Sequence, residues 1–273
     1  MEERTGLART PQLASFDLVL INSSAGKDSQ AMLSHLVSLA VIADIPRSRL
    51  IVVHADLGRV EWPGTAELAA EQAAAYGLRF ETVRRTRGDL LEQIESRGMF
   101  PSSTARYCTS DQKTSQVAKL MTELTRDWRA EHGHERPIRI LNCLGIRAQE
   151  SPARAKKPPL SRDSASNGRR TVTRWLPIFH WTARATPHGT EPDDVWDTIL
   201  RSGLRWHPAY DAGMPRLSCV FCVLSGRREL VLAAQLNPAL AADYDAVEAR
   251  IGHTFRVELS MADIIAQAAG VAS

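Results

Sequence analysis

Long apolar runs and cysteines are both scarce in this sequence of 273 residues. No apolar run approaches the roughly 18 residues that a membrane-spanning helix needs. Met1 to Ser15 carries charges and lacks the apolar core of a secretion signal, so we expect a cytoplasmic protein with no membrane partner. The four cysteines are then not expected to form a disulfide framework.

A stretch of small and charged residues, Ser23-Ser24-Ala25-Gly26-Lys27-Asp28-Ser29, separates two regular segments. The segment before it has the apolar content of a buried strand, and the segment after it has apolar residues at helical spacing. A strand, a turn of small residues and a helix N-terminus form an anion site, because free N–H groups converge there. The stretch is not a Walker A loop, which has Gly at the position of Ile21 and Ser or Thr at that of Asp28. A serine-rich helix cap without a ligand is the alternative interpretation.

The order of the predicted elements indicates an α/β fold. Further strands are expected at residues 49–54, 79–83 and 138–144, and helices at residues 67–76 and 109–128. Alternating strands and helices form a parallel sheet with helices on both faces, which binds ligands at the carboxyl ends of its strands. Ser24–Ser29 and Asp56–Gly58 each follow a strand, so both can contact one nucleotide. We expect a nucleotide-binding α/β domain at residues 1–174 and a small helical C-terminal subdomain at residues 175–273.

Positive charge is concentrated in one segment, although the net charge of the chain is only +3. Residues 147–174 contain eight Lys and Arg residues and two acidic residues. Such a concentration is typical of an anion site or a nucleic-acid contact, and a solvated basic loop is the alternative. Residues 152–171 are rich in Pro, Ser and Gly, so we expect a mobile loop that covers the site.

Two of the four cysteines have the spacing of a metal or cluster site. In Cys219-x-x-Cys222, which belongs to the predicted C-terminal subdomain, the short turn directs both thiolates the same way. Cys143 lies within an apolar strand, where a buried structural thiol is expected. Cys108 has no ligand-like spacing of its own.

Five segments in the same order resemble the PP-loop superfamily, and within it the phosphoadenosine phosphosulfate (PAPS) reductase family. The first resembles the PP-loop Ser-Gly-Gly-x-Asp-Ser, with Ala25 in place of the first Gly; its methyl costs ~1–2 kcal/mol if φ is positive. The others are His54–Gly58, Arg106–Lys113, Gly145–Arg154, and the C-terminal group Trp175–Trp181, Val195-Trp196, His207–Asp211 and Cys219–Cys222. The resemblance implies a PP-loop α/β fold and an enzyme that uses ATP or a related adenine nucleotide.

Roles for individual residues also come from this resemblance. It implies nucleotide contacts at Ser24, Gly26, Ser29, Asp56 and Gly58, and catalytic roles for Lys27, Asp28, Arg147 and Arg154. Lys27 is expected to hold phosphates by its charge, and Asp28 to hold Mg²⁺ or orient the loop. The two arginines are expected to stabilise the negative charge that develops at the transferred group.

The resemblance adds a third thiol to the cysteine pair. Iron–sulfur members of the superfamily combine a cysteine of the Arg-Tyr-Cys-Thr segment with a later Cys-x-x-Cys, which implies Cys108 together with Cys219 and Cys222. We expect a [4Fe–4S] cluster, with zinc as the alternative. The fourth ligand stays open between Cys143, a non-cysteine group and an exogenous sulfide.

One family motif is absent from this sequence. Sulfonucleotide reductases attack the substrate sulfur with a cysteine in a C-terminal Glu-Cys-Gly-x-His motif, and this chain has no cysteine after Cys222. We therefore expect an ATP pyrophosphatase that transfers sulfur to an acceptor, DNA or RNA being favoured, with a cysteine desulfurase or another sulfur donor as partner. The iron–sulfur PP-loop ATPases of DNA phosphorothioation are the expected functional relatives. The alternatives are a PAPS or adenylylsulfate reductase with an external thiol, and a non-catalytic, nucleotide-responsive nucleic-acid-binding component.

Overall fold

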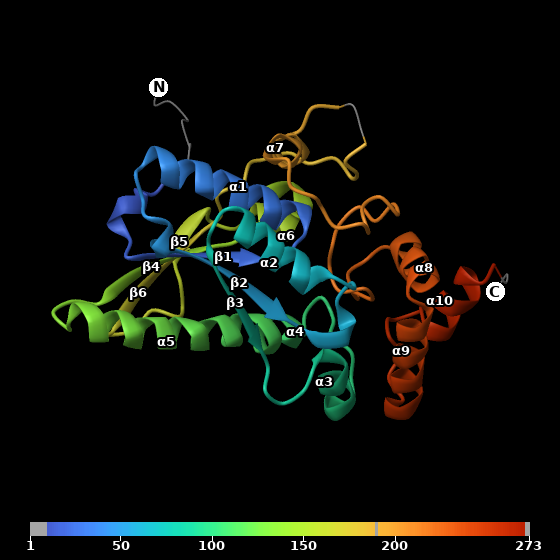
Figure 1. Cartoon of the computed structure of the whole chain (residues 1–273). Helices are drawn as coiled ribbons and strands as arrows, with labels where there is room; N and C mark the ends of the chain where they lie inside the picture. Colours follow the sequence, from blue (N-terminus) through green and yellow to red (C-terminus); the bar gives the residue numbers. More distant parts are fainter. Residues whose placement is uncertain (1–9, 189–190, 271–273) are drawn as a thin grey trace, which may run out of the picture.

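The computed structural model describes residues 10–188 and 191–270, with a six-stranded sheet at the centre (Figure 1). The strands have the order β3-β2-β1-β4-β6-β5, and every neighbouring pair is parallel except β5 and β6. The order reverses between β1 and β4, where open sheets form a ligand crevice. The bounds are β1 Leu18–Ser23, β2 Leu50–Asp56, β3 Arg79–Arg84, β4 Ile138–Cys143, β5 Leu160–Arg162 and β6 Arg170–Trp175.

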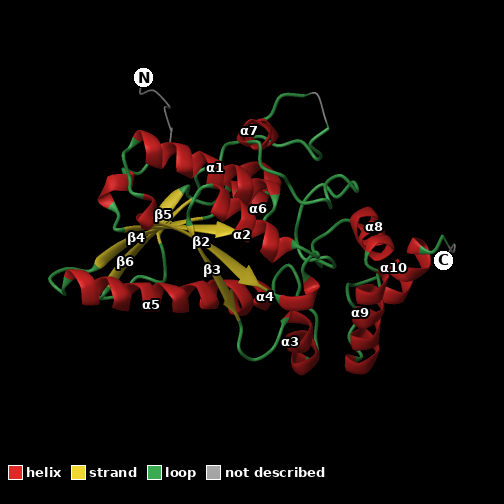
Figure 2. Cartoon of the chain, viewed as in Figure 1, coloured by secondary structure: helices red, strands yellow, loops and turns green. Residues whose placement is uncertain are grey.

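Helices cover both faces of the sheet (Figure 2). Because side chains alternate along a strand, Val19 and Ile21 pack with α1 and α2 on one face, and Leu20 packs with α5 on the other. This arrangement confirms the predicted α/β fold with a parallel sheet between helices. The three helices are α1 Lys27–Ile42, α2 Thr65–Ala75 and α5 Ser115–His132.

The C-terminal helices share a core with segments from the first half of the chain. Phe221 and Tyr244 pack in one cluster with Leu57, Val60 and Leu90. The last strand, β6, ends at Trp175, one residue past the boundary at residue 174 that the sequence predicted between two domains. This division into two domains stays a prediction. The helices of this core are α3 Leu90–Arg97, α8 Arg227–Leu236, α9 Pro238–Ile251 and α10 Met261–Ala268, whereas α7 Asp194–Ser202 packs with Ala31 of α1.

The helix expected at residues 109–128 begins irregularly. It starts as the short α4, Tyr107–Thr109, continues as a π-helical turn over Ser110–Thr114 and becomes regular only in α5. Single π-helical turns occur frequently at functional sites. Further short turns are the 3₁₀ segments Leu13–Ser15, Arg47–Arg49, Gly58–Val60 and Ala148–Glu150. Among the described residues, no helix has the length and apolarity to cross a bilayer.

The basic segment is more ordered than the expected mobile loop. It contains a short helix, α6 Pro152–Ala155, followed by the antiparallel strands β5 and β6 at the edge of the sheet. Arg170 is buried, and its guanidinium donates to the Ala165 carbonyl at 2.7 Å and to the Thr122 hydroxyl at 2.8 Å. Arg170 therefore stabilises the hairpin and, although it is one of the eight basic residues of this segment, is not available for an anion or nucleic-acid contact. Part of the segment expected as a loop therefore has regular structure, because strand pairing satisfies its backbone; its mobility stays a prediction.

Candidate functional site

The predicted phosphate loop connects β1 to α1, with Gly26 as the N-cap of the helix. Ala25 has a φ of +53°, so the cost of a methyl group in this left-handed region, ~1–2 kcal/mol, applies. The same methyl group is fully buried and packs against Leu68 and Ala69 of α2. Burial of one carbon is worth about 0.8 kcal/mol, so packing offsets part of the strain where the family pattern has Gly.

Serine hydroxyls shape this loop from within. The Ser29 hydroxyl donates to the Gly26 carbonyl at 2.9 Å and accepts the Ser24 N–H at 3.2 Å. The Ser23 hydroxyl accepts the Ala25 N–H at 3.2 Å. These bonds hold the loop in one conformation at the helix N-terminus, where phosphate groups bind in other proteins. Contacts of Ser24, Gly26 and Ser29 with a nucleotide stay a prediction.

Asp28 and Arg147 form an ion pair between the phosphate loop and the segment that follows β4. Arg147 Nε donates to Asp28 Oδ1 at 2.6 Å, and both side chains are largely buried. Burial raises the pKa of the Asp28 carboxyl, and the adjacent guanidinium only partly counteracts it. Glu150 accepts the Arg147 backbone N–H at 2.9 Å and is also paired with Arg154. Three of the four predicted catalytic residues therefore belong to one charge network.

Gly145 explains how these two segments come so close. A Cβ atom on this residue would lie 3.0 Å from the carbonyl carbon and oxygen of Asp28 and 3.1 Å from the Ser29 nitrogen. Because backbone atoms cannot move aside as a flexible side chain can, only glycine fits without a shift. In the Gly-Ile-Arg motif, Gly145 thus lets the segment after β4 approach the phosphate loop, and Arg147 forms the ion pair with Asp28 that this approach allows.

Lys27 does not point its charge into the loop as the sequence suggested. Its ammonium donates to the carbonyls of Arg184 and Pro215 at 2.7 Å each and to that of Ala185 at 3.2 Å. Burial lowers the pKa of Lys27 to about 8. Three carbonyl acceptors require all three ammonium protons, so the charged form fits this environment. The side chain therefore anchors two C-terminal segments over α1, and a phosphate contact by Lys27 stays a prediction.

Tyr210 is a contact at the phosphate loop that sequence reasoning missed. Its hydroxyl accepts the Lys27 backbone N–H at 2.7 Å and the Leu217 N–H at 3.3 Å. The residue is fully enclosed and packs edge-on against Trp196. The segment His207–Asp211 did stand out in the sequence as part of the family pattern, but nothing in it indicated a bond to the loop.

The second predicted nucleotide turn follows β2, next to β1. Asp56 Oδ1 accepts the Gly58 N–H at 2.7 Å, which forms a tight turn. Gly58 has a φ of +78°, and a Cβ there would lie 2.4 Å from the Asp89 Cβ. Glycine is thus required by the backbone and by the approach of α3. Both turns lie at the carboxyl edge of the sheet as predicted, while their contact with a nucleotide stays a prediction.

His54 links the two turns and was not singled out in the sequence as a functional side chain. It is buried, with Nδ1 at 3.0 Å from the Ser23 carbonyl oxygen and Nε2 at 3.0 Å from Glu61 Oε2. Both neighbours are acceptors, so the protonated ring, which donates from both nitrogens, fits this environment. Burial alone would lower the pKa of His54, but the hydrogen bond and charge of Glu61 outweigh it and raise that pKa.

The cysteines separate into two environments. Cys108 and Cys219 pack against the cluster shared by the C-terminal helices, whereas Cys143 is fully buried under α1. Burial raises the pKa of Cys219 to about 12; the nearby Cys222 and Cys108 raise it further, and Lys113 opposes them. Two of the three predicted ligands, Cys108 and Cys219, therefore pack against the same cluster, Cys143 does not join them, and a shared site with Cys222 stays a prediction. Among the described residues, however, no group of three His, Cys, Asp or Glu side chains has metal-ligand geometry.

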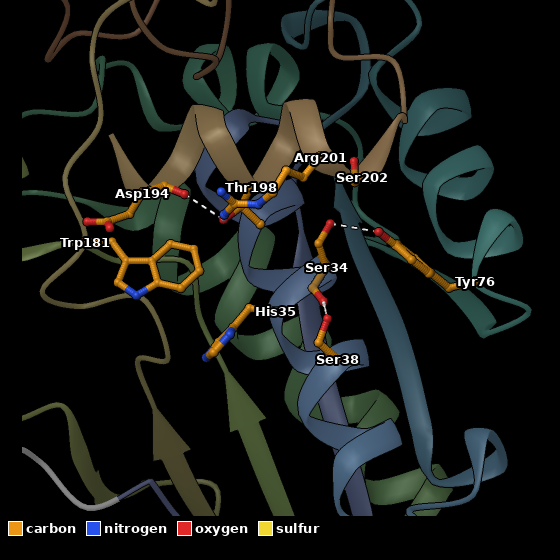
Figure 3. A pocket seen from close by; sticks show the side chains of 9 residues that line it. All are labelled: Ser34, His35, Ser38, Tyr76, Trp181, Asp194, Thr198, Arg201 and Ser202. Atoms are coloured by element: carbon orange, nitrogen blue, oxygen red, sulfur yellow. Dashed lines mark hydrogen bonds between the residues drawn. The ribbon is translucent and has the colours of Figure 1, made fainter. Parts of the chain in front are cut away.

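Two surface clefts lie outside this charge network. Figure 3 shows one of about 430 Å³ between α1 and α7. Its hydroxyls are occupied: Ser38 donates to the Ser34 carbonyl at 3.0 Å, and Thr198 donates to the Asp194 carbonyl at 2.7 Å. None of the site residues predicted from the sequence lines this cleft. Its lining residues are Ser34, His35, Ser38, Tyr76, Trp181, Asp194, Thr198, Arg201 and Ser202. A second cleft, of about 480 Å³, lies between the irregular start of α5 and the β5–β6 turn.

Comparison with known proteins gives a family and several distant likenesses. A curated protein of Escherichia phage 186, an uncharacterized 37.8 kDa protein in the gpa 5′ region, is 30% identical over 164 residues. The match covers 60% of this chain and 42% of the phage protein. Two crystal structures of Candida glabrata FMN adenylyltransferase are 15% identical, with TM-scores of 0.45 and 0.44. They cover 75% and 76% of this chain and 53% and 56% of those chains, the second being a complex with FMN and an ATP analogue.

The family match spans most of the sheet and the site. Residues 19–225 match the phosphoadenosine phosphosulfate reductase domain. This range includes the phosphate loop, the Asp28–Arg147 pair and all four cysteines. Together with the parallel sheet and its reversal of strand order, the match assigns the chain: it belongs to the phosphoadenosine phosphosulfate reductase domain family.

Proposed function

We propose that this chain is an ATP pyrophosphatase that adenylylates an acceptor and transfers sulfur to it, with a nucleic acid as the favoured acceptor. The observation that carries the proposal is the buried Asp28–Arg147 pair, which joins the phosphate loop after β1 to the segment after β4. The pair lies where the strand order reverses, the usual ligand crevice of such sheets. A site built there can hold a nucleotide and the group that attacks it.

The phosphates would bind at the N-terminus of α1, through the backbone N–H groups of Ser24–Ser29 and the positive end of the helix. Asp28 would hold Mg²⁺ with its second carboxylate oxygen, because Mg²⁺ prefers carboxylates and keeps several waters. Arg147 and Arg154, fixed through Glu150, would stabilise the charge that develops on the departing pyrophosphate. Lys27 would act by position, because its ammonium holds residues 184–185 and 215 over the loop.

Cys108, Cys219 and Cys222 would hold a [4Fe–4S] cluster, with zinc as the alternative. Support comes from their common environment and from Lys113, whose charge acts on both Cys108 and Cys219. A bound cluster with an open iron would supply a place for the transferred sulfur. Because the three thiols lack metal-ligand geometry in this structure, the nucleotide chemistry is derived from the protein's own residues alone.

Release of pyrophosphate from ATP tests this function. Purified protein with ATP and Mg²⁺ is expected to release pyrophosphate, and release should increase when DNA or tRNA is added. Asp28→Asn should abolish release, while Arg139→Gln, an exposed change at the opposite end of β4, should not alter it. If PAPS or adenylylsulfate is reduced with an external thiol and ATP is not cleaved, the reductase alternative is correct. Nucleotide binding without any turnover would instead favour the non-catalytic component.

A further inference from the structure

We propose that the cleft between residues 106–118 and the β5–β6 turn is the acceptor subsite, where one nucleotide of a polynucleotide binds with its phosphate on Arg106. This inference rests on the proposed transfer to a nucleic acid and names the place on the protein where that acceptor lies. The cleft has a volume of about 480 Å³, within the range of small-molecule sites. It is lined by Arg106, Thr109, Ser110, Thr114, Ser115, Ala118, Asp163, Ser164 and Ala165.

A chain of amide hydrogen bonds connects this cleft to the nucleotide crevice. Asn22, two residues before the phosphate loop, donates to Asn142 Oδ1 at 2.7 Å across β1 and β4. Asn142 in turn donates to Asp163 Oδ2 at 3.1 Å, and Asp163 begins the turn that lines the cleft. The cleft is therefore adjacent to the point where the strand order reverses. An acceptor bound there would lie beside a nucleotide held at the phosphate loop.

Three exposed polar side chains of this cleft have no partner among the described residues. Arg106 is exposed, and its guanidinium forms no ion pair or hydrogen bond with any residue that the structure describes. The hydroxyls of Thr114 and Ser164 likewise have no partner within residues 10–188 and 191–270. The hydroxyls of Ser110 and Ser115 instead donate to carbonyls of their own helical segment, as the serine and threonine hydroxyls of the cleft in Figure 3 do. An unpaired guanidinium beside free hydroxyls fits a phosphate attached to a sugar.

The surrounding charge and the lack of aromatic residues agree on the type of ligand. Exposed cations occur on both sides of the cleft-lining turn, at Arg162 before it and Arg169 after it, with Lys156 and Lys157 further upstream. These residues can neutralise the phosphates that flank the bound nucleotide. The lining contains no aromatic side chain for base stacking. We therefore expect recognition of the sugar–phosphate backbone with little dependence on base sequence.

Cys108 lies two residues after Arg106, and the π-helical turn follows immediately. A phosphate held by Arg106 would thus be close to the first of the three thiols. The cleft is the place where an activated acceptor could meet the sulfur-bearing part of the protein. The π turn over Ser110–Thr114 connects Thr109 to Ser115, and Thr109, Thr114 and Ser115 all line the cleft.

Fluorescence anisotropy with labelled single-stranded DNA and RNA of about 16 nucleotides tests this subsite. Arg106→Gln should raise the Kd about tenfold, as expected for loss of a charge-assisted bond, and lower the slope of log K against log salt by about 1. Arg139→Gln removes the same charge from an exposed position at the amino end of β4 and is the matched control. Comparison of DNA with RNA identifies which polymer binds more tightly.

Each result decides the matter. Weaker binding in the Arg106 variant alone supports the subsite. Equal weakening in both variants, unchanged binding in the Arg106 variant, or no binding of either polymer by the parent protein overturns it. Pyrophosphate release by the parent protein is measured separately. If the parent releases pyrophosphate but nucleic-acid binding does not depend on Arg106, only the subsite is overturned. If binding depends on Arg106 but the parent releases no pyrophosphate, only the proposed enzymatic function is overturned. Unfolding midpoints of both variants confirm that they are folded.

Discussion

Asp28 and Arg147 are 119 residues apart in the chain, yet Oδ1 of the one lies 2.6 Å from Nε of the other. The contact is possible because parallel pairing of β1 with β4 brings their carboxyl ends together and because Gly145 has no side chain. Each residue belongs to a motif that the sequence indicates separately. Their pairing shows that the two motifs form a single site.

Removal of either partner of this pair should impair both stability and turnover. Asp28→Asn leaves the buried Arg147 guanidinium without its counter-charge, so unfolding free energy should fall by about 3 kcal/mol. Urea unfolding of both single variants and of Asp28→Asn/Arg147→Gln measures the coupling between them. Additive losses in this double-mutant cycle would mean that the pair contributes no interaction energy.

Lys27→Met should destabilise the protein more than it weakens nucleotide binding. The variant leaves the carbonyls of Ala185 and Pro215 without a donor, whereas that of Arg184 keeps the Trp196 indole N–H at 3.0 Å. Each buried unsatisfied group costs about 1–3 kcal/mol. Relief of the buried charge offsets part of this, so we expect a net loss of about 2 kcal/mol. Thermal unfolding and titration with an adenine nucleotide measure the two effects. If the variant keeps the stability of the parent protein but no longer binds the nucleotide, Lys27 contacts the phosphates directly, as the sequence predicted.

Ala25→Gly should leave stability nearly unchanged, although the residue has positive φ. Glycine relieves ~1–2 kcal/mol of backbone strain in the folded protein. Two losses oppose this gain: a buried methyl group worth about 0.8 kcal/mol is removed, and the greater conformational entropy of the unfolded chain destabilises the folded state by about 0.4–1 kcal/mol. Ala25→Val should instead destabilise strongly, because a branched side chain does not tolerate this φ and the site is fully buried. Chemical denaturation measures both, and a large stabilisation by glycine would mean that packing against Leu68 is worth little.

The His54–Glu61 pair should make stability depend on pH. The folded pKa of His54 is raised above its unfolded value of about 6.5. Its contribution is therefore fully present below about pH 6.5 and is lost as pH rises through the folded pKa. Burial lowers the pKa of His35 and His207, so their contributions have the opposite sign. Unfolding free energy of the parent minus that of His54→Gln, measured across this range, isolates the effect, and a difference that does not decrease with pH would contradict it.

Cysteine variants should separate the predicted ligands from the structural thiol. Anaerobically purified protein is expected to contain iron and acid-labile sulfide, and Cys108→Ser, Cys219→Ser or Cys222→Ser should remove most of it. Cys143→Ser is the control for metal content, because this thiol packs under α1 away from the others. Stoichiometric zinc without sulfide would show that the site binds zinc instead of a cluster. Loss of iron only in the Cys143 variant would contradict the assignment of the three ligands.

Much of the scaffold could be predicted because it depends on local pattern. The apolar run of β1, the small residues after it and the helical spacing of α1 are neighbours in the chain, and backbone preferences and period determine what they form. The same holds for β4 and the Gly145–Arg154 segment. The α/β fold and the placement of both motifs at one edge of the sheet followed from these patterns, and the structure agrees.

The direction and partner of individual charged side chains were decided by tertiary packing alone. Lys27 turns toward the carbonyls of residues 184–185 and 215, Arg170 is buried inside its hairpin, and His54 bridges Ser23 and Glu61. The residue pattern does not encode these contacts, because each depends on which acceptor the packing of the whole chain brings within about 3 Å. The sequence by itself determined which residues surround the crevice. Only the folded chain decided which of their side chains, like that of Lys27, form bonds within the protein.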